Sequence, residues 1–223
     1  DTSARWVNYI HSKLNRTRVA QIHRPGSRDE LRRIIRQASS TGQQISICGG
    51  RHAMGGQQFG TDTQLVDIGG FSRILDLDRE RGLLEVESGI QWPELIEQLL
   101  ERQKGSPQPW TIAQKQTGAD RLTVGGALAA NIHSRGLTMQ PIISNVESFE
   151  IITPIGETKK CSRSQNAELF RLAIGGYGLF GTITLIKLRL VRRQKLQRRV
   201  ELSSVDTLMP RIDRAIAAGA VYG

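Results

Sequence analysis

The chain has 223 residues, enough for one large domain or two small lobes with a hydrophobic core. No apolar run approaches the roughly 20 residues of a membrane-spanning helix, and two cysteines, Cys48 and Cys161, are too few for a disulfide framework and lack metal-ligand spacing. We therefore expect no metal site, and two small buried cysteine side chains. The net charge of +10 fits an anionic partner, but aromatic residues make up only 5% of the chain, so we expect no nucleic-acid partner.

The first part of the chain predicts a small parallel β/α unit. Residues 18–23 are typical of a strand, and Ser27 with Glu30 forms a capping box that begins a helix. Residues 44–48 and 65–68 then supply two more strands. A strand, helix and strand in this order predict a right-handed parallel crossover.

The second part predicts a mainly antiparallel α+β arrangement, with a hairpin, a helix that begins at Pro93, a second strand pair, a further helix and a long final strand. We expect these elements at residues 73–78 and 83–88, 93–100, 146–153 and 158–161, 167–174, and 181–191. A new helix begins after Ser203, shortly before the sequence ends. We therefore expect a first lobe at residues 1–70, a second lobe at residues 71–192, and the start of an otherwise missing substrate or cap domain at residues 193–223.

Basic residues are concentrated near the C-terminal end of the chain. Residues 187–199 hold seven lysines and arginines, and their alternation with Leu188, Leu190 and Val200 predicts the solvated face of strands. No signal-peptide pattern opens the chain, so we expect a cytoplasmic protein or a targeting segment outside this sequence.

Two segments are rich in glycine: residues 49–56, which follow a short apolar run, and residues 123–126. Glycines directly after a buried strand let the backbone approach a ligand closely, and their N–H groups can converge on an anion. The first segment is neither the G-x-G-x-x-G fingerprint nor a P-loop. A tight turn between strands is the structural alternative for it.

Several ordered motifs carry a family resemblance. They are Trp6-Val7-Asn8, Arg24-Pro25, Gly49-Gly50-Arg51-His52, Thr123-Val124-Gly125-Gly126, residues 131–136, Val146-Glu147-Ser148, and Leu169-Phe170 followed by residues 175–181. Over residues 5 to 192 the chain resembles the FAD-binding (PCMH-type) domain of the vanillyl-alcohol oxidase / p-cresol methylhydroxylase family of FAD-linked oxidases. Within that family it is most similar to bacterial sugar, aldonolactone and decaprenylphosphoryl-ribose oxidase-like members. The resemblance implies an α+β fold with FAD between a small parallel β/α lobe and a larger, mainly antiparallel lobe.

The resemblance also implies which residues bind FAD. Residues 49–54 would wrap the pyrophosphate through backbone N–H groups, and Ile183 would contact FAD through its backbone. The remaining implied contacts come from the second glycine motif and the segment after it. The full implied set is Gly49, Gly50, Arg51, His52, Ala53, Met54, Gly118, Thr123, Val124, Gly125, Gly126, Asn131, His133 and Ile183. The glycines at 175, 176 and 178 form a third glycine cluster of the resembling family. The structural alternative for these three glycines is a helix C-cap followed by a turn.

His52 is the residue for which the resemblance implies the most specific role. In many members of the family a histidine at this position bonds covalently to the 8α-methyl group of the flavin, which requires a neutral imidazole. The alternative is a histidine that only forms hydrogen bonds near the dimethylbenzene edge. Doubly linked relatives carry a cysteine before the second motif, where this chain has Ala119-Asp120-Arg121, so we expect no double link.

The implied function is FAD-dependent oxidation of an alcohol on a sugar, polyol or aldonolactone-like substrate by hydride transfer to flavin N5, with O₂ or another acceptor reoxidising the flavin. No catalytic base is identified, because in the resembling families it comes largely from the cap domain. Two alternatives stay open: an alkyl-glycerone-phosphate-synthase-like flavoenzyme, and a non-catalytic basic interaction module on the same fold.

Overall fold

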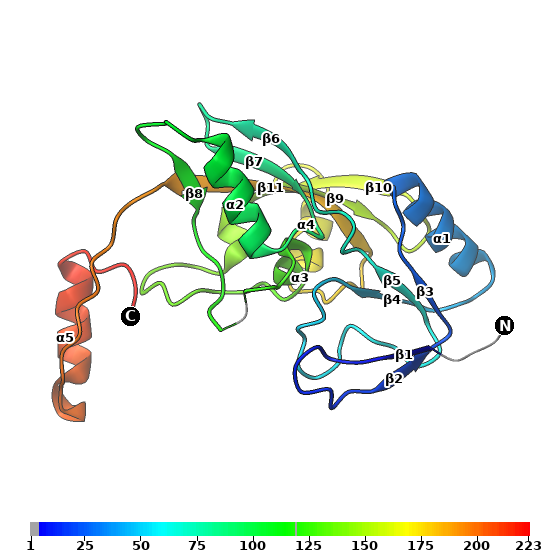
Figure 1. The fold of residues 1–223 in the computed structure, drawn as a ribbon, viewed down its shortest axis with the longest axis horizontal. Coiled ribbons are helices and arrows are strands. Elements are labelled where there is room, and N and C mark those ends of the chain that lie inside the picture. The colour runs from blue at the N-terminus through cyan, green and yellow to red at the C-terminus, as the bar shows by residue number, and fades with distance from the viewer. Residues whose placement is uncertain (1–4, 119) are drawn as a thin grey trace.

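The computed structural model describes residues 5–118 and 120–223. Strands and helices are both present along the whole chain, as expected for an α+β protein (Figure 1). The strands are β1 Arg5–Val7, β2 Thr17–Val19, β3 Gln21–His23, β4 Ile45–Cys48, β5 Gln64–Asp67, β6 Ile74–Asp78, β7 Leu83–Glu87, β8 Trp110–Ile112, β9 Val146–Ile152, β10 Thr158–Ser162 and β11 Thr182–Arg192. The helices are α1 Arg28–Ser40, α2 Trp92–Arg102, α3 Val124–Ala129, α4 Ala167–Ala173 and α5 Val205–Ala217, with a 3₁₀ turn η1 at Ile142–Asn145.

The smaller sheet is parallel and has the order β3-β5-β4. Helix α1 connects β3 to β4 and buries Leu31, Ile35 and Ala38. Its start uses the predicted capping residues, because the Ser27 side chain accepts a hydrogen bond from the Glu30 N–H (3.1 Å). The Glu30 carboxylate closes the turn one residue earlier than a standard capping box, by accepting from the Gly26 N–H (2.8 Å).

The larger sheet is antiparallel, with the order β10-β9-β11-β7-β6 and with β8 paired to the end of β11. Helices α2, α3 and α4 lie together on one face of this sheet (Figure 1). Their apolar side chains join those of the sheet in the main hydrophobic core, which includes Trp92, Leu128, Phe149, Phe170 and Ile186. Through Val124, Ala127 and Leu128, the core therefore packs α3 against the long strand β11.

The α+β class and the arrangement of a parallel and an antiparallel sheet are confirmed. The predicted strand at residues 18–23 is wrong in one respect, because it is divided at Ala20. Residues 17–19 pair with β1, whereas residues 21–23 pair with β5. The Ala20 N–H bonds to the Thr63 carbonyl (2.9 Å) at the point where the chain passes from one sheet to the other.

The predicted strand face at residues 187–199 is also partly wrong. Strand β11 ends at Arg192, where its last pairing partner is Trp110 of β8, and the following Arg193 N–H bonds to Pro109 (2.9 Å). Residues 193–204 have no strand partner in the described chain, and they are exposed and irregular. Helix α5 stands apart from the body of the molecule (Figure 1), and none of its residues is buried.

No helix in the described ranges has the length and apolar character needed to cross a membrane. Over the same ranges, no group of three or more His, Cys, Asp or Glu side chains is arranged to hold a metal ion.

Candidate active site

The first glycine motif leaves the sheet where β4 ends at Cys48. Its backbone turns sharply, and Arg51 adopts a left-handed conformation with φ of 57°. Across the part of the chain that the structure describes, no hydrogen bond is formed by the N–H groups of residues 49–55. A loop of consecutive N–H groups that are free to donate is suited to hold an anion.

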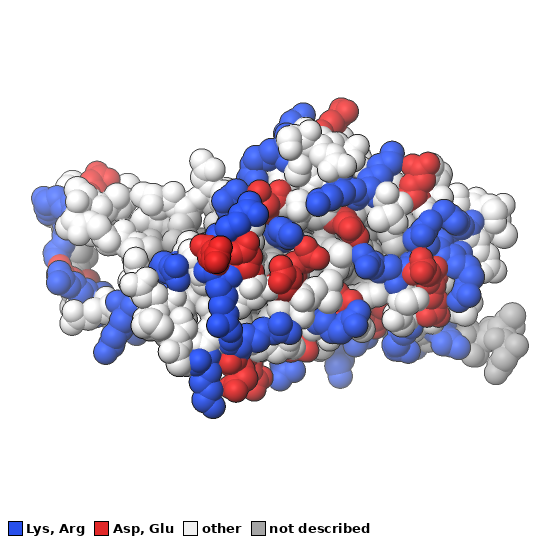
Figure 2. Space-filling view, turned by 90° about the horizontal axis from the view of Figure 1, so that it is seen from above, with Lys and Arg blue, Asp and Glu red and all other residues white. Residues whose placement is uncertain are grey.

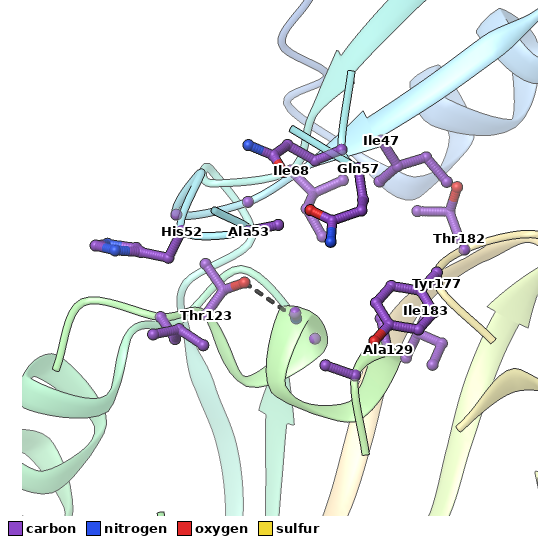
Figure 3. Close-up of a pocket in the computed structure, with 18 of the residues that line it drawn as sticks. Ile47, His52, Ala53, Gln57, Ile68, Thr123, Ala129, Tyr177, Thr182 and Ile183 are labelled. Atoms are coloured by element: carbon purple, nitrogen blue, oxygen red, sulfur yellow. Dashed lines mark hydrogen bonds between the residues drawn. The ribbon is translucent and has the colours of Figure 1, made fainter. Parts of the chain in front are cut away.

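The second glycine motif is built differently. Thr123 caps α3, and its side chain accepts from the Gly126 N–H at 3.1 Å (dashed line in Figure 3). The Val124 N–H donates to the Ile90 carbonyl (2.9 Å) and the Gly125 N–H to the Ser88 carbonyl (2.7 Å). The donors at this helix start are therefore already used within the protein, so the motif supports the site by close packing.

The two motifs meet through their glycines. A Cβ atom on Gly49 would overlap the hydroxyl of Thr123, and one on Gly50 would overlap the backbone carbonyl of Arg121. Gly125 in turn lies against Ser88, whose carbonyl oxygen would be 2.9 Å from an added Cβ. The absence of side chains at these positions lets three backbone segments approach one another.

A cavity of about 300 Å³ lies where the motifs meet. His52 and Ala53 lie toward one side of it, and Tyr177, Thr182 and Ile183 lie toward the other (Figure 3). The predicted residues that line it are Gly49, Gly50, Arg51, His52, Ala53, Thr123, Gly125, Gly126 and Ile183. An elongated ligand could therefore contact both motifs and the start of β11 at once.

The other predicted residues do not line this cavity. Met54 is 75% exposed, and Val124 is buried in the main core. Asn131 takes a left-handed conformation and accepts from the Ile143 N–H at 3.3 Å. His133 and Gly118 lie on loops outside the cavity lining, and Ala119, which bears on the expected lack of a double link, is outside the described residues.

Sequence reasoning missed several cavity residues, chiefly Gln57, Gln58, Ala129 and Tyr177. Both amide atoms of Gln58 are buried and form no hydrogen bond in the described part of the chain. Buried amides are normally paired, so this side chain is one that a polar ligand could satisfy. Its position directly after the first glycine motif was the available signal.

His52 pairs with a second histidine that the sequence analysis did not single out. The Nδ1 atom of His52 lies 3.2 Å from the Nε2 atom of His11, and the two ring centroids are 4.9 Å apart. Burial and the neighbouring His11 lower the pKa of His52, and the nearby Arg121 backbone carbonyl acts in the opposite direction. The net lowering favours the neutral imidazole.

These features agree with the comparisons to known proteins. The chain belongs to the family described as "FAD binding domain", whose sequence profile matches residues 19–162. This confirms the resemblance to FAD-linked oxidases and identifies FAD as the cofactor of the family. The free N–H groups, the glycine-lined approach and the unpaired amide of Gln58 fit a large polar cofactor of this kind.

More particular relatives share part of their length with this chain. It is 29% identical to L-gulono-1,4-lactone dehydrogenase of Mycobacterium tuberculosis (strain ATCC 25618 / H37Rv), over 74% of this chain and 36% of that protein. It is 26% identical to L-gulonolactone oxidase of Bos taurus, over 85% of this chain and 41% of that protein. Cytokinin dehydrogenase 3 of Oryza sativa subsp. japonica is 33% identical, over 66% of this chain and 27% of that protein.

A solved structure of alkyldihydroxyacetonephosphate synthase has the same fold. It superposes with a TM-score of 0.70 at 21% identity, covering 81% of this chain and 33% of that chain. The chain thus spans well under half the length of each of these proteins.

Proposed function

We propose that this chain is the FAD-binding part of an oxidoreductase that oxidises an alcohol group of a sugar, polyol or aldonolactone. The observation that carries the proposal is the cavity beside residues 49–55, where free backbone donors lie against the tightly packed start of α3. The names of two relatives, which refer to gulonolactone, support the aldonolactone class.

In this proposal the pyrophosphate of FAD binds to the N–H groups of residues 49–54. Thr123, Gly125, Gly126 and Ile183 contact the cofactor from the opposite wall of the cavity. The roles of Gly118, Val124, Asn131 and His133 stay predictions, and they would act through the loops and core beside the cavity rather than from its lining.

The proposal keeps the division into lobes at residues 1–70 and 71–192. Its support is that the parallel sheet β3-β5-β4 lies within the first range and the antiparallel sheet within the second. Residues 193–223 would begin the substrate-side domain, and the lack of buried residues in α5 fits a helix that packs against chain beyond this sequence. We also propose a cytoplasmic location.

Bound FAD would supply a two-electron acceptor at N5 for the substrate hydride. The residues of this chain would bind and orient the cofactor, and the cavity walls would exclude water from it. The proposal assigns no catalytic base to this chain, and O₂ or another acceptor would take up the electrons.

The proposal includes a covalent bond between His52 and the flavin. The lowered pKa of His52 supports this bond, because only a neutral imidazole has the lone pair that attacks carbon. Replacing His52 by alanine should abolish any covalent flavin and leave the fold intact.

The test is the visible spectrum of the full-length protein before and after acid precipitation, with His52→Ala as the matched variant. Flavin bands that stay with the wild-type pellet and leave the variant pellet support both parts of the proposal. Release of flavin from both proteins would support the oxidoreductase proposal and contradict the covalent bond to His52. A colourless protein that takes up no FAD would overturn the proposal.

The charge distribution weakens the alternative of a basic interaction module. Figure 2 shows acidic and basic side chains interspersed on the face that it presents. Two of the basic residues on β11 are paired, Lys187 with Glu85 (3.0 Å) and Arg189 with Glu147. These two side chains are therefore partly neutralised by glutamates, so a polyanion would meet fewer free positive charges on β11 than the seven basic residues of 187–199 suggest.

A further inference from the structure

The loop between β1 and β2 has an ordered backbone and an exposed apolar tip. The Asn8 side chain fastens it, because its oxygen accepts from the N–H groups of Tyr9 and Asn15, both at 2.9 Å. The Asn8 amide nitrogen also donates to the Lys13 carbonyl at 2.7 Å, and Lys13 turns the chain with a left-handed φ of 56°. Leu14 follows at once and is 84% exposed. A fixed backbone therefore presents a large apolar side chain to solvent.

The first glycine motif runs beside this loop in the same direction. The Ile10 N–H bonds to the Arg51 carbonyl at 3.4 Å. Further along both loops, a Cβ atom on Gly56 would lie 2.9 Å from the Cβ of Asn15. The two contacts keep the same spacing along the chain, so residue 14 comes opposite residues 54 and 55.

The side chains at this place form an exposed apolar surface. Met54 is 75% exposed, and the register of the two loops places it beside the tip that carries Leu14. Trp6 of β1 is 53% exposed, and the Arg16 guanidinium lies 4.2 Å from the centre of its ring. Ile10 is exposed as well. Figure 1 shows β1 and β2 at one edge of the molecule, where a large partner has access to them.

The same surface is positively charged. Residues 5–20 and 49–61 contain no Asp or Glu. Lys13, Arg16 and Arg51 are exposed, and within the described residues they form no ion pair. In contrast, Arg18 of β2 is neutralised by Asp62 at 2.6 Å. An anionic surface would therefore meet three cations that have no competing carboxylate.

Exposed apolar side chains surrounded by polar ones mark an interaction site for a protein or a membrane. Single apolar side chains that project from loop tips can enter a fluid lipid layer, whereas a protein partner would need a complementary pocket for each of them. A tryptophan ring prefers the boundary between headgroups and acyl chains. Lysine and arginine are attracted to anionic headgroups. An anionic lipid surface fits all of these features.

We propose that these residues attach the protein to the surface of an anionic membrane. The proposed contact surface, called the N-terminal patch below, consists of Trp6, Ile10, Lys13, Leu14, Arg16 and Met54. Its apolar members enter the acyl boundary and its cations lie among the lipid phosphates. Because Met54 belongs to the first glycine motif, attachment brings the cofactor cavity of the proposed function close to the lipid.

The test measures how the full-length protein sediments with vesicles of phosphatidylcholine alone or of equal parts phosphatidylcholine and phosphatidylglycerol. We expect binding to the mixed vesicles that weakens as salt is added, because salt screens the attraction between charges. Leu14→Ser should lower the partition coefficient about tenfold, as expected when one leucine side chain no longer leaves water. Lys13→Gln should lower it about fivefold on the mixed vesicles, the usual effect of one cation near an anionic membrane.

Ile155→Ser is the matched control. Ile155 is 62% exposed in the turn between β9 and β10, so this variant loses an exposed apolar side chain outside the N-terminal patch. It should bind the vesicles as the wild type does. An equal loss in Ile155→Ser would show unspecific hydrophobic adsorption and would overturn the inference.

Two further outcomes would also overturn it. If Leu14→Ser and Lys13→Gln both bind like the wild type, attachment lies elsewhere, as on the basic residues of 187–199. If the wild type does not bind the mixed vesicles, the N-terminal patch is covered by the rest of the chain or by an acidic protein. Neither outcome affects the oxidoreductase proposal, which the flavin spectrum tests separately.

Discussion

The two glycine-rich motifs have similar compositions but use their backbones in opposite ways. In residues 49–55 the N–H groups lack partners within the described chain, whereas in residues 124–127 each N–H bonds to Ile90, Ser88 or Thr123. The first motif is therefore equipped to bind a ligand and the second to hold the first in place. Glycine serves ligand approach in one case and protein packing in the other.

The largest expected effect comes from Gly125→Val. The new Cβ would lie 2.9 Å from the Ser88 carbonyl oxygen and equally near its Cβ, so the clash is with protein rather than with cofactor. We expect the apoprotein to lose about 3 kcal/mol of stability, near the upper end for overpacking, as measured by chemical denaturation without FAD. A variant apoprotein as stable as the wild type would contradict the packing role of the second motif and favour direct contact of this motif with the cofactor.

Gly50→Ala should act mainly on binding. Its Cβ would overlap the Arg121 carbonyl and force the two motifs apart. We expect FAD affinity to fall by about tenfold, or 1.4 kcal/mol, as measured by titration with FAD. Gly55→Ala is the control, because its Cβ would meet only the flexible Gln57 side chain, at 3.0 Å, and affinity should change little. Equal losses in both variants would contradict the special role of the Gly50 contact.

Thr123→Ala removes the cap of α3 by deleting the oxygen that accepts from the Gly126 N–H. Stability should fall by about 1 kcal/mol, the usual cost of losing such a cap, in the same denaturation experiment. Thr123→Ser keeps the hydroxyl and should recover most of the loss. A serine variant as unstable as alanine would assign the effect to the methyl group.

The last effect concerns Cys48, directly before the first motif, and it is absent at neutral pH. Burial, with a further contribution from Asp67, raises the pKa of its thiol to about 12. The unfolded thiol ionises near 9.0, so this contribution to stability is complete below pH 9.0 and is lost as pH rises toward 12. The loss should reach at most about 1.4 kcal/mol per pH unit, and Cys48→Ala should flatten this slope in denaturation between pH 8 and 10. If the slope of stability against pH is the same in Cys48→Ala and in the wild type, the Cys48 thiol is in contact with water rather than buried.

Local sequence patterns predicted most elements correctly. The turn between β6 and β7 and the start of α1 depend on residues within a few positions of one another, which is why the sequence reveals them. The division at Ala20 and the end of β11 at Arg192 depend on strands far along the chain, β5 and β8. No local pattern specifies those partners.

The same distinction holds for the site. The sequence by itself determined the family and located the two glycine motifs, because glycine spacing is a property of short segments. The role of His52 stays a prediction. Only the tertiary structure decided that the N–H groups of the second motif are bonded within the protein and that Val124 lies in the core. It also decided that His11 contacts His52, which is 41 positions away in the sequence. Hydrogen bonds and burial are settled by which segments meet in space, and that depends on the packing of the whole chain.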